Sequence, residues 1–178
     1  LDYFMDKIAE YDSLFRWKTV VTNDRDRPRM EIMAHHSSIP GFNDSGAHNQ
    51  QMAYHDGGLK FLKQMLNNPE FMPIEKAIEK LTGGSAKWLG IDTGTIEVGK
   101  NADMVIIDQE KLKTGLGGPV EYFDEKFGGN MRLIKKSDGI VPYVIISGNL
   151  AVENCEFNSE LGQKRFGRLL RAQKESKS

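Results

Sequence analysis

Residues 80–108 read KLTGGSAKWLGIDTGTIEVGKNADMVIID, and within them the pattern of the chain changes from helical to strand-like. Ser85 can cap a short helix over SAKWLG, which Gly90 ends. Strands are expected at 95–97 and 102–108, joined by the turn VGKN, and the second is apolar enough for a buried strand. We therefore place a boundary near residue 92, between an α/β portion and a mostly β portion.

Before this boundary, the spacing of apolar residues predicts several helices. Steps of three or four predict a helix in 1–15 and another at 58–66, and Pro73 opens a third that has Ile74, Ala77, Ile78 and Leu81 on one face. The intervening segments are less regular. WKTVVT (17–22) favours a strand, NDRDRPR (23–29) a charged turn punctuated by Pro28, and 30–36 a short helix.

After the boundary, turn chemistry gives the strongest signals. Segments 143–147 and 150–153 flank Gly148-Asn149, a pair of residues typical of a tight hairpin. Residues 109–139 are rich in glycine and charge without a strong period, so we expect a long surface excursion. The tail from residue 162 is a candidate basic helix.

The composition argues against nucleic-acid and membrane partners. The 178 residues are 39% hydrophobic and 28% charged, with a net charge of −1, so no global field attracts polyanions. A single cysteine, Cys155, excludes an intramolecular disulfide, and no apolar run approaches the ~20 residues of a membrane span. A small-molecule partner and a cytoplasmic location are expected. Because Leu1 opens the chain without a signal peptide, we expect a coding sequence cut short upstream.

Two apparent motifs carry little weight. GTIEVGK (94–100) imitates a phosphate-binding loop, but Asn101 replaces the magnesium-binding hydroxyl and a strand follows instead of a helix. His35, His36, His48 and His55 lack the two-His-plus-Glu spacing of a helical zinc site, and the adjacent His35 and His36 would diverge on regular backbone.

Asp44 is the candidate catalytic residue. The short segment IPGFN (39–43) delivers it to the polar turn DSGAH, with His48 four residues on. A carboxylate in such a turn can hold a metal or accept a proton, although it can equally cap the turn that follows.

Read as a whole, the chain resembles a known family. GFNDSGAH (41–48) is similar to the GxSDAGAH segment of the D-aminoacylase (N-acyl-D-amino-acid deacylase) branch of the amidohydrolase superfamily. Residues 80–108 resemble that family's helix-to-strand passage. Residues 16–23, 128–154 and 162–171, the last with a terminal GxxxGRxLR pattern, match further segments in order. The resemblance covers nearly all of the chain.

The resemblance implies an α/β fold: residues 1–92 would be the C-terminal part of a (β/α)8 barrel, and residues 93–178 the C-terminal part of a small β-sandwich domain with a basic tail. A complete barrel takes roughly 250 residues, so this chain would supply only its last portion. Asp44 would stand at the end of the eighth strand. The histidine pair of the first strand and the family's other upstream ligands have no counterparts here.

The resemblance also implies the chemistry of the intact enzyme. Zinc would activate water to cleave an N-acyl amino acid, and Asp44 would contact the metal and act as general base and then general acid. Asn43 and Ser45 stand where the family has Ser and Ala, which leaves the substrate open, and His48 would orient substrate. The metal site of this chain alone would be incomplete or absent.

Two alternatives remain open. The substrate could be a cyclic amide, as in hydantoinases and dihydroorotases. The chain could instead be a non-catalytic module that associates into a homo-oligomer through the strand edges and apolar faces that a partial barrel exposes.

Overall fold

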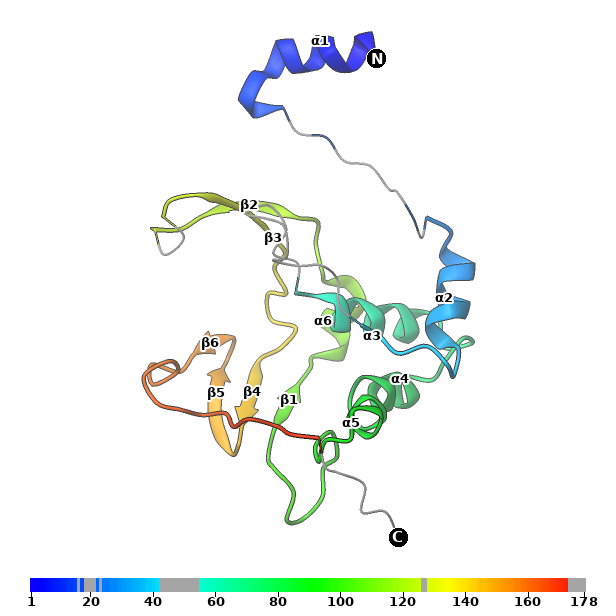
Figure 1. Ribbon diagram of the computed structural model, residues 1–178, viewed down its shortest axis with the longest axis vertical. Helices are drawn as coiled ribbons and strands as arrows, with labels where there is room; N and C mark the ends of the chain where they lie inside the picture. Colours follow the sequence, from blue (N-terminus) through cyan, green and yellow to red (C-terminus); the bar gives the residue numbers. More distant parts are fainter. Residues whose placement is uncertain (16, 18–21, 23, 42–54, 126–127, 173–178) are drawn as a thin grey trace.

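The structure, a computed structural model, describes all residues except 16, 18–21, 23, 42–54, 126–127 and 173–178. It is a mixed α/β fold: among the described residues, five α-helices precede residue 90 and the first strand begins at residue 104 (Figure 1). None of the helices it describes is long and apolar enough to span a bilayer. The chain thus combines helices and sheet, as predicted.

The first helix, α1 (Asp2–Tyr11), continues into the short 3-10 helix η1 (Asp12–Leu14) and confirms the helix predicted in 1–15. It buries none of its residues and stands apart from the other elements in Figure 1. On this helix the ring of Phe4 meets Phe15 and Trp17 edge-on, with centroids 5.3 and 6.0 Å apart. The strand predicted at 17–22 lies mostly outside the described residues.

Helix α2 (Asp26–Ala34) corrects the predicted turn at 23–29. Pro28 lies in the first turn of this helix, where backbone N–H groups have no intrahelical acceptor, so its missing donor costs nothing. Asp26 occupies the same turn and favours it electrostatically, with an ion pair to Arg29 at 2.5 Å. The helix therefore begins four residues earlier than its apolar pattern indicates.

Helices α3 (Gly57–Asn67), α4 (Ile74–Leu81) and α5 (Gly83–Leu89) follow. The first two confirm the predicted helices, and Gly90 ends α5 in the left-handed conformation, as expected. Ser85 does not cap α5: it lies inside that helix and donates to the Lys80 carbonyl at 2.7 Å. Ile78, predicted on the apolar face of α4, is 46% exposed, whereas Ala77 is fully buried.

The main core joins these helices to later segments. It consists of residues from α2, α3 and α4 with two from beyond residue 108: Met30, Phe61, Leu62, Met65, Ala77, Leu112 and Ile140. Phe61, Met65 and Ile140 are its largest fully buried side chains.

A four-stranded antiparallel sheet has the order β1-β4-β5-β6, from strands β1 (Met104–Ile106), β4 (Tyr143–Ile146), β5 (Asn149–Glu153) and β6 (Glu156–Phe157). The predicted hairpin is confirmed, but its two-residue loop is Ser147-Gly148, because Ile146 pairs with Asn149. Residues 95–97 form no strand. Strand β1 is at an edge, and Val105 and Ile106 are 55% and 52% exposed rather than buried.

Residues 109–139 contain more structure than predicted. Helix α6 (Gln109–Thr114) begins where the Asp108 carboxylate accepts from the Lys111 backbone N–H at 2.9 Å. Strands β2 (Val120–Phe123) and β3 (Met131–Ile134) then pair antiparallel. The predicted basic helix is absent from 162–172, the described part of the tail. The barrel, the sandwich and the boundary near residue 92 stay predictions.

Candidate functional site

The four residues singled out in the sequence lie outside the described residues. Asn43, Asp44, Ser45 and His48 all belong to 42–54. What the structure describes is how the chain reaches this segment, through 35–41, and how it leaves it, through 55–56 into α3.

The approach to this segment is held by Lys80 on α4. Its ammonium group donates to the backbone carbonyls of Met33 at 2.8 Å and His35 at 2.6 Å, and to the Ser38 hydroxyl at 3.1 Å. Ser38 in turn donates to the Ile32 carbonyl at 2.5 Å. Burial lowers the pKa of Lys80 below its ordinary value of 10.5. One half-buried cation thus satisfies carbonyls that the end of α2 leaves without intrahelical donors.

The exit from the segment is held by an ion pair. Asp56, which immediately precedes α3, lies 3.1 Å from the ammonium group of Lys135, just beyond β3. The two side chains are only 10% and 18% exposed. Because water screens the pair poorly, this contact is a stronger constraint than an ordinary surface salt bridge. It ties the start of α3 to a residue 79 positions further along the chain.

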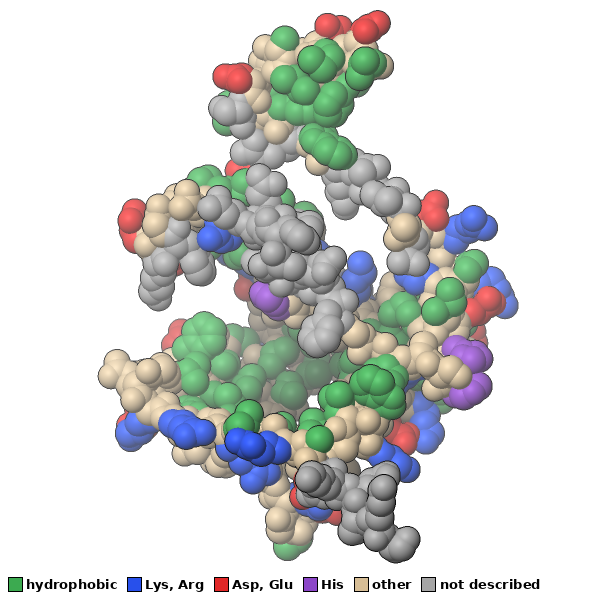
Figure 2. Space-filling model, in the orientation of Figure 1, with side chains coloured by type: hydrophobic (Ala, Val, Ile, Leu, Met, Phe, Trp, Pro, Cys, Tyr) green, Lys and Arg blue, Asp and Glu red, His purple; other side chains and the backbone are tan. Residues whose placement is uncertain are grey.

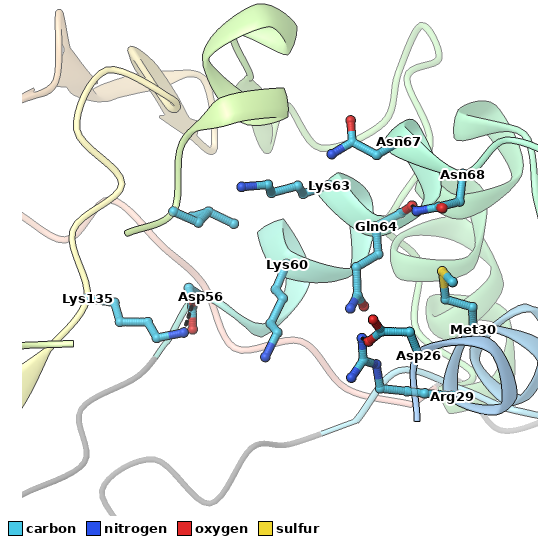
Figure 3. Close-up of a pocket in the computed structure, with 11 residues that line it drawn as sticks. Asp26, Arg29, Met30, Asp56, Lys60, Lys63, Gln64, Asn67, Asn68 and Lys135 are labelled. Atoms are coloured by element: carbon cyan, nitrogen blue, oxygen red, sulfur yellow. Dashed lines mark hydrogen bonds and ion pairs between the residues drawn. The ribbon is translucent and has the colours of Figure 1, made fainter. Parts of the chain in front are cut away.

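The same pair lines a cleft of about 340 Å³ between α2, α3 and the segments around residues 116 and 135 (Figure 3). Most of its lining side chains are charged or carry amides: Asp26, Arg29, Met30, Asp56, Lys60, Lys63, Gln64, Asn67, Asn68, Leu116 and Lys135. Four of these are cationic and two are carboxylates. The carboxylates are already paired, Asp26 with Arg29 and Asp56 with Lys135.

The described histidines do not form a metal site. The rings of His35 and His36 lie with centroids 4.3 Å apart and planes tilted by 38°, whereas divergence was predicted for a regular backbone. The reason is that His35 ends α2 with an extended backbone, so regular helical geometry does not apply there. Within the described part of the chain, no three His, Cys, Asp or Glu side chains gather as a metal ion would require. These residues by themselves therefore do not fit a zinc ion.

Comparison with known families identifies the class of the chain. The model of the amidohydrolase family matches residues 12–149, a range that includes Asp44, Lys80, the cleft and strands β1 and β4. The chain belongs to the amidohydrolase family.

Individual relatives agree with this membership. The chain is 32% identical over 182 residues to an uncharacterized protein of Mycobacterium tuberculosis, a match that covers 97% of this chain and 30% of that protein. It is 32% identical over 87 residues to a dihydroorotase of Acetivibrio thermocellus, covering 49% of this chain and 20% of the relative. A 5'-deoxyadenosine deaminase of Methanosarcina acetivorans is 41% identical over 49 residues, covering 28% and 11%. No solved structure matches the chain.

Sequence reasoning missed the residues that the structure brings together around the segment. Lys80 and Lys135 act across 42 to 79 positions of sequence, so no local pattern reveals them. The polar face of α3 was recoverable: residues 60, 63, 64 and 67 have the helical spacing of one face, opposite the buried Phe61, Leu62 and Met65.

Proposed function

We propose that this chain is the C-terminal part of a hydrolase that cleaves a C–N bond other than a peptide bond. Membership of the amidohydrolase family carries the proposal, because the matched range contains Asp44 and the sequence DSGAH that it opens. The chain spans 30% of its M. tuberculosis relative, so the activity is proposed for a longer protein. Its architecture would be a (β/α)8 barrel that ends within 1–92, followed by a small β-sandwich.

Asp44 is the proposed general base and general acid. Its carboxylate would accept the proton of the attacking water and deliver it to the leaving nitrogen, which prevents expulsion of an unstable amide anion. Asn43, Ser45 and His48 flank it, and we propose that they orient the substrate. Zinc, which activates water in such hydrolases, would be held by Asp44 with residues upstream of this chain, since the described residues form no site for it.

The leading substrate class is an N-acyl-D-amino acid. Support comes from the similarity of GFNDSGAH to the D-aminoacylase segment and from the terminal GxxxGRxLR pattern in 162–171. A cyclic amide is the second candidate, because the dihydroorotase relative aligns with about half of this chain. Both reactions break a C–N bond next to a carbonyl, so they place the same demand on Asp44.

The test compares substrates and variants on the full-length protein. Acylated D-amino acids, their L-enantiomers, hydantoin and dihydroorotate would be assayed side by side with wild type, Asp44→Asn and Asp138→Asn, the last an exposed carboxylate far along the chain. We expect preferential turnover of the D-series and a loss of about a hundredfold or more in Asp44→Asn, with Asp138→Asn unchanged. Full activity in Asp44→Asn would refute the role of Asp44, and turnover of dihydroorotate alone would favour the cyclic amide.

A further inference from the structure

The cleft beside α3 has more positive charge than its own carboxylates neutralise. Arg29 and Lys135 are paired with Asp26 and Asp56, at 2.5 and 3.1 Å, which leaves Lys60 and Lys63 as two cations in excess. In the described chain, Lys60 makes no ion pair or side-chain hydrogen bond. Lys63 donates to the neutral Gly115 carbonyl at 2.5 Å, which leaves two of its three N–H donors for another acceptor.

The two lysines in excess and two side-chain amides lie on one helical face. Lys60, Lys63, Gln64 and Asn67 follow one another at steps of three, one and three along α3, so they line the same wall of the cleft. Figure 3 shows Lys60 extending from α3 between the two ion pairs. The side-chain amide of Gln64 adds a donor that can rotate toward a ligand in the cleft. Cations flanked by amide donors are the chemistry that binds small oxyanions.

We propose that this cleft is a binding site for a small dianion, a phosphate monoester or a dicarboxylate, distinct from the hydrolytic chemistry proposed for Asp44. Two point charges in excess match two negative charges, and a volume of about 340 Å³ accommodates a molecule of that size. Lys60 supplies the uncommitted charge, and Lys63 the second. Asp26 and Asp56 neutralise the other two cations of the cleft, Arg29 and Lys135, and these ion pairs hold its walls.

Calorimetric titration of the full-length protein at low ionic strength tests the site, with inorganic phosphate and succinate as separate probes. We expect saturable binding of at least one probe, weakened about tenfold in Lys60→Gln, an effect of about 1.4 kcal/mol, and lost in Lys60→Gln/Lys63→Gln. Lys60→Arg keeps the charge and should keep most of the affinity. Lys87→Gln, an exposed lysine on α5, is the matched control.

The outcomes distinguish a phosphate ligand from a dicarboxylate ligand. They also test the anion site independently of the proposed hydrolytic function. Tighter phosphate binding assigns the site to phosphate monoesters, and tighter succinate binding assigns it to dicarboxylates. No saturable binding to wild type, or equal weakening in Lys60→Gln and Lys87→Gln, overturns the site. Because the readout is affinity and needs no turnover, failure of the proposed hydrolytic function leaves this result intact.

Discussion

Lys80 organises a segment that lies more than 40 residues away in the sequence. Its ammonium group accounts for three contacts, to Met33, His35 and Ser38, at 2.6 to 3.1 Å. Hydrogen bonds from a charged donor contribute about 1.5–3 kcal/mol, and Lys80 shares these acceptors with Ser38, whose hydroxyl donates to the Met33 and His35 carbonyls at 3.3 and 2.9 Å. It also fixes the course of the chain just before residues 42–54, the segment that contains Asp44.

Replacing this lysine should therefore destabilise the fold. We expect Lys80→Met to lower the free energy of unfolding by about 1–3 kcal/mol, because the methylene stem is kept while the donors are lost. Urea titration followed by circular dichroism measures the change. Lys76→Met on the same helix is the control: its ion pair with Glu79 is exposed, so its loss should cost less than about 0.5 kcal/mol. Equal effects of the two variants would contradict the role of Lys80.

The lowered pKa of Lys80 also predicts a pH dependence. Between its folded-state pKa and the ordinary value of 10.5, the unfolded chain binds more protons at this residue than the folded chain. The contribution of Lys80 to stability therefore rises with pH through that alkaline window. The difference in unfolding free energy between wild type and Lys80→Met should grow as the pH is raised toward 10.5. A difference that shrinks over that interval would contradict the assignment.

The pair Asp56–Lys135 should behave as a buried interaction. Lys135→Met leaves the Asp56 carboxylate, 10% exposed, without this partner, and we expect a loss of about 3 kcal/mol. The exposed pair Lys100–Asp92 is the comparison, since its side chains are 38% and 49% exposed and Lys100→Met should cost at most about 1 kcal/mol. Thermal or urea unfolding measures both. A double variant with Asp56→Asn should recover part of the loss, because no charge is then stranded.

At the scale of elements, the hairpin β4–β5 depends on backbone conformation at two residues. Ser147 and Gly148 have φ values of 48° and 80°, as the two-residue loop of a primed turn requires. The loop is held from outside, because the Ser147 N–H donates to the Asp103 carboxylate at 2.7 Å and the Gly148 N–H to the Ala102 carbonyl at 2.9 Å. The two residues that anchor this turn, Ala102 and Asp103, immediately precede strand β1.

Gly148→Ala isolates the cost of that conformation. An added Cβ at Gly148 would meet nothing within 4 Å, so only the left-handed φ matters, and we expect a loss of about 1 kcal/mol. Gly117→Ala is the control, because its Cβ is equally unobstructed and its φ is not in that region. Its stability should be unchanged or slightly raised. Chemical denaturation distinguishes the two, and a neutral Gly148→Ala would contradict the predicted strain.

The sequence predicted those elements whose cause is local. The apolar spacing of α3, the glycine that ends α5 and the turn chemistry of β4–β5 act within a few residues. It failed where the cause is distant: β2 and β3 have little individual pattern and are defined by pairing Val120 with Ile134, 14 positions away. Pro28 was interpreted as a turn residue, but a proline in the first turn of a helix does not interrupt it. Helix α6 has a local cause, because Asp108 caps its first turn.

For the candidate site, the candidate catalytic residues come from the sequence, and the residues that hold the neighbouring segments in place come from the structure. GFNDSGAH identified Asp44, Asn43, Ser45 and His48 through a resemblance, and their roles stay proposals because they lie outside the described residues. Lys80, Asp56 and Lys135 emerged only from three-dimensional contacts. Likewise, β1 is as apolar as predicted but not buried, because burial depends on what covers a strand and the described chain does not cover this one.

At the scale of the whole molecule, many large hydrophobic side chains of the described residues are exposed. Figure 2 shows hydrophobic side chains gathered over the sheet and α5. Trp88 is 71% exposed, Phe157 80% and Val105 55%. Exposed apolar area of this kind favours association, and a net charge of −1 offers little electrostatic repulsion against it.

We therefore expect the isolated 178-residue chain to self-associate, with strand β1 at the contact. This strand pairs with β4 on one side and with no other named strand, so its outer edge can add a strand from a second copy. Val105→Lys places a charge on that edge and should shift sedimentation velocity profiles toward the monomer. Val98→Lys, at a fully exposed turn position outside any strand, adds the same charge without touching the edge and should leave the profile unchanged. Equal shifts would attribute association to general hydrophobicity, and a wild-type monomer at all concentrations would contradict the prediction.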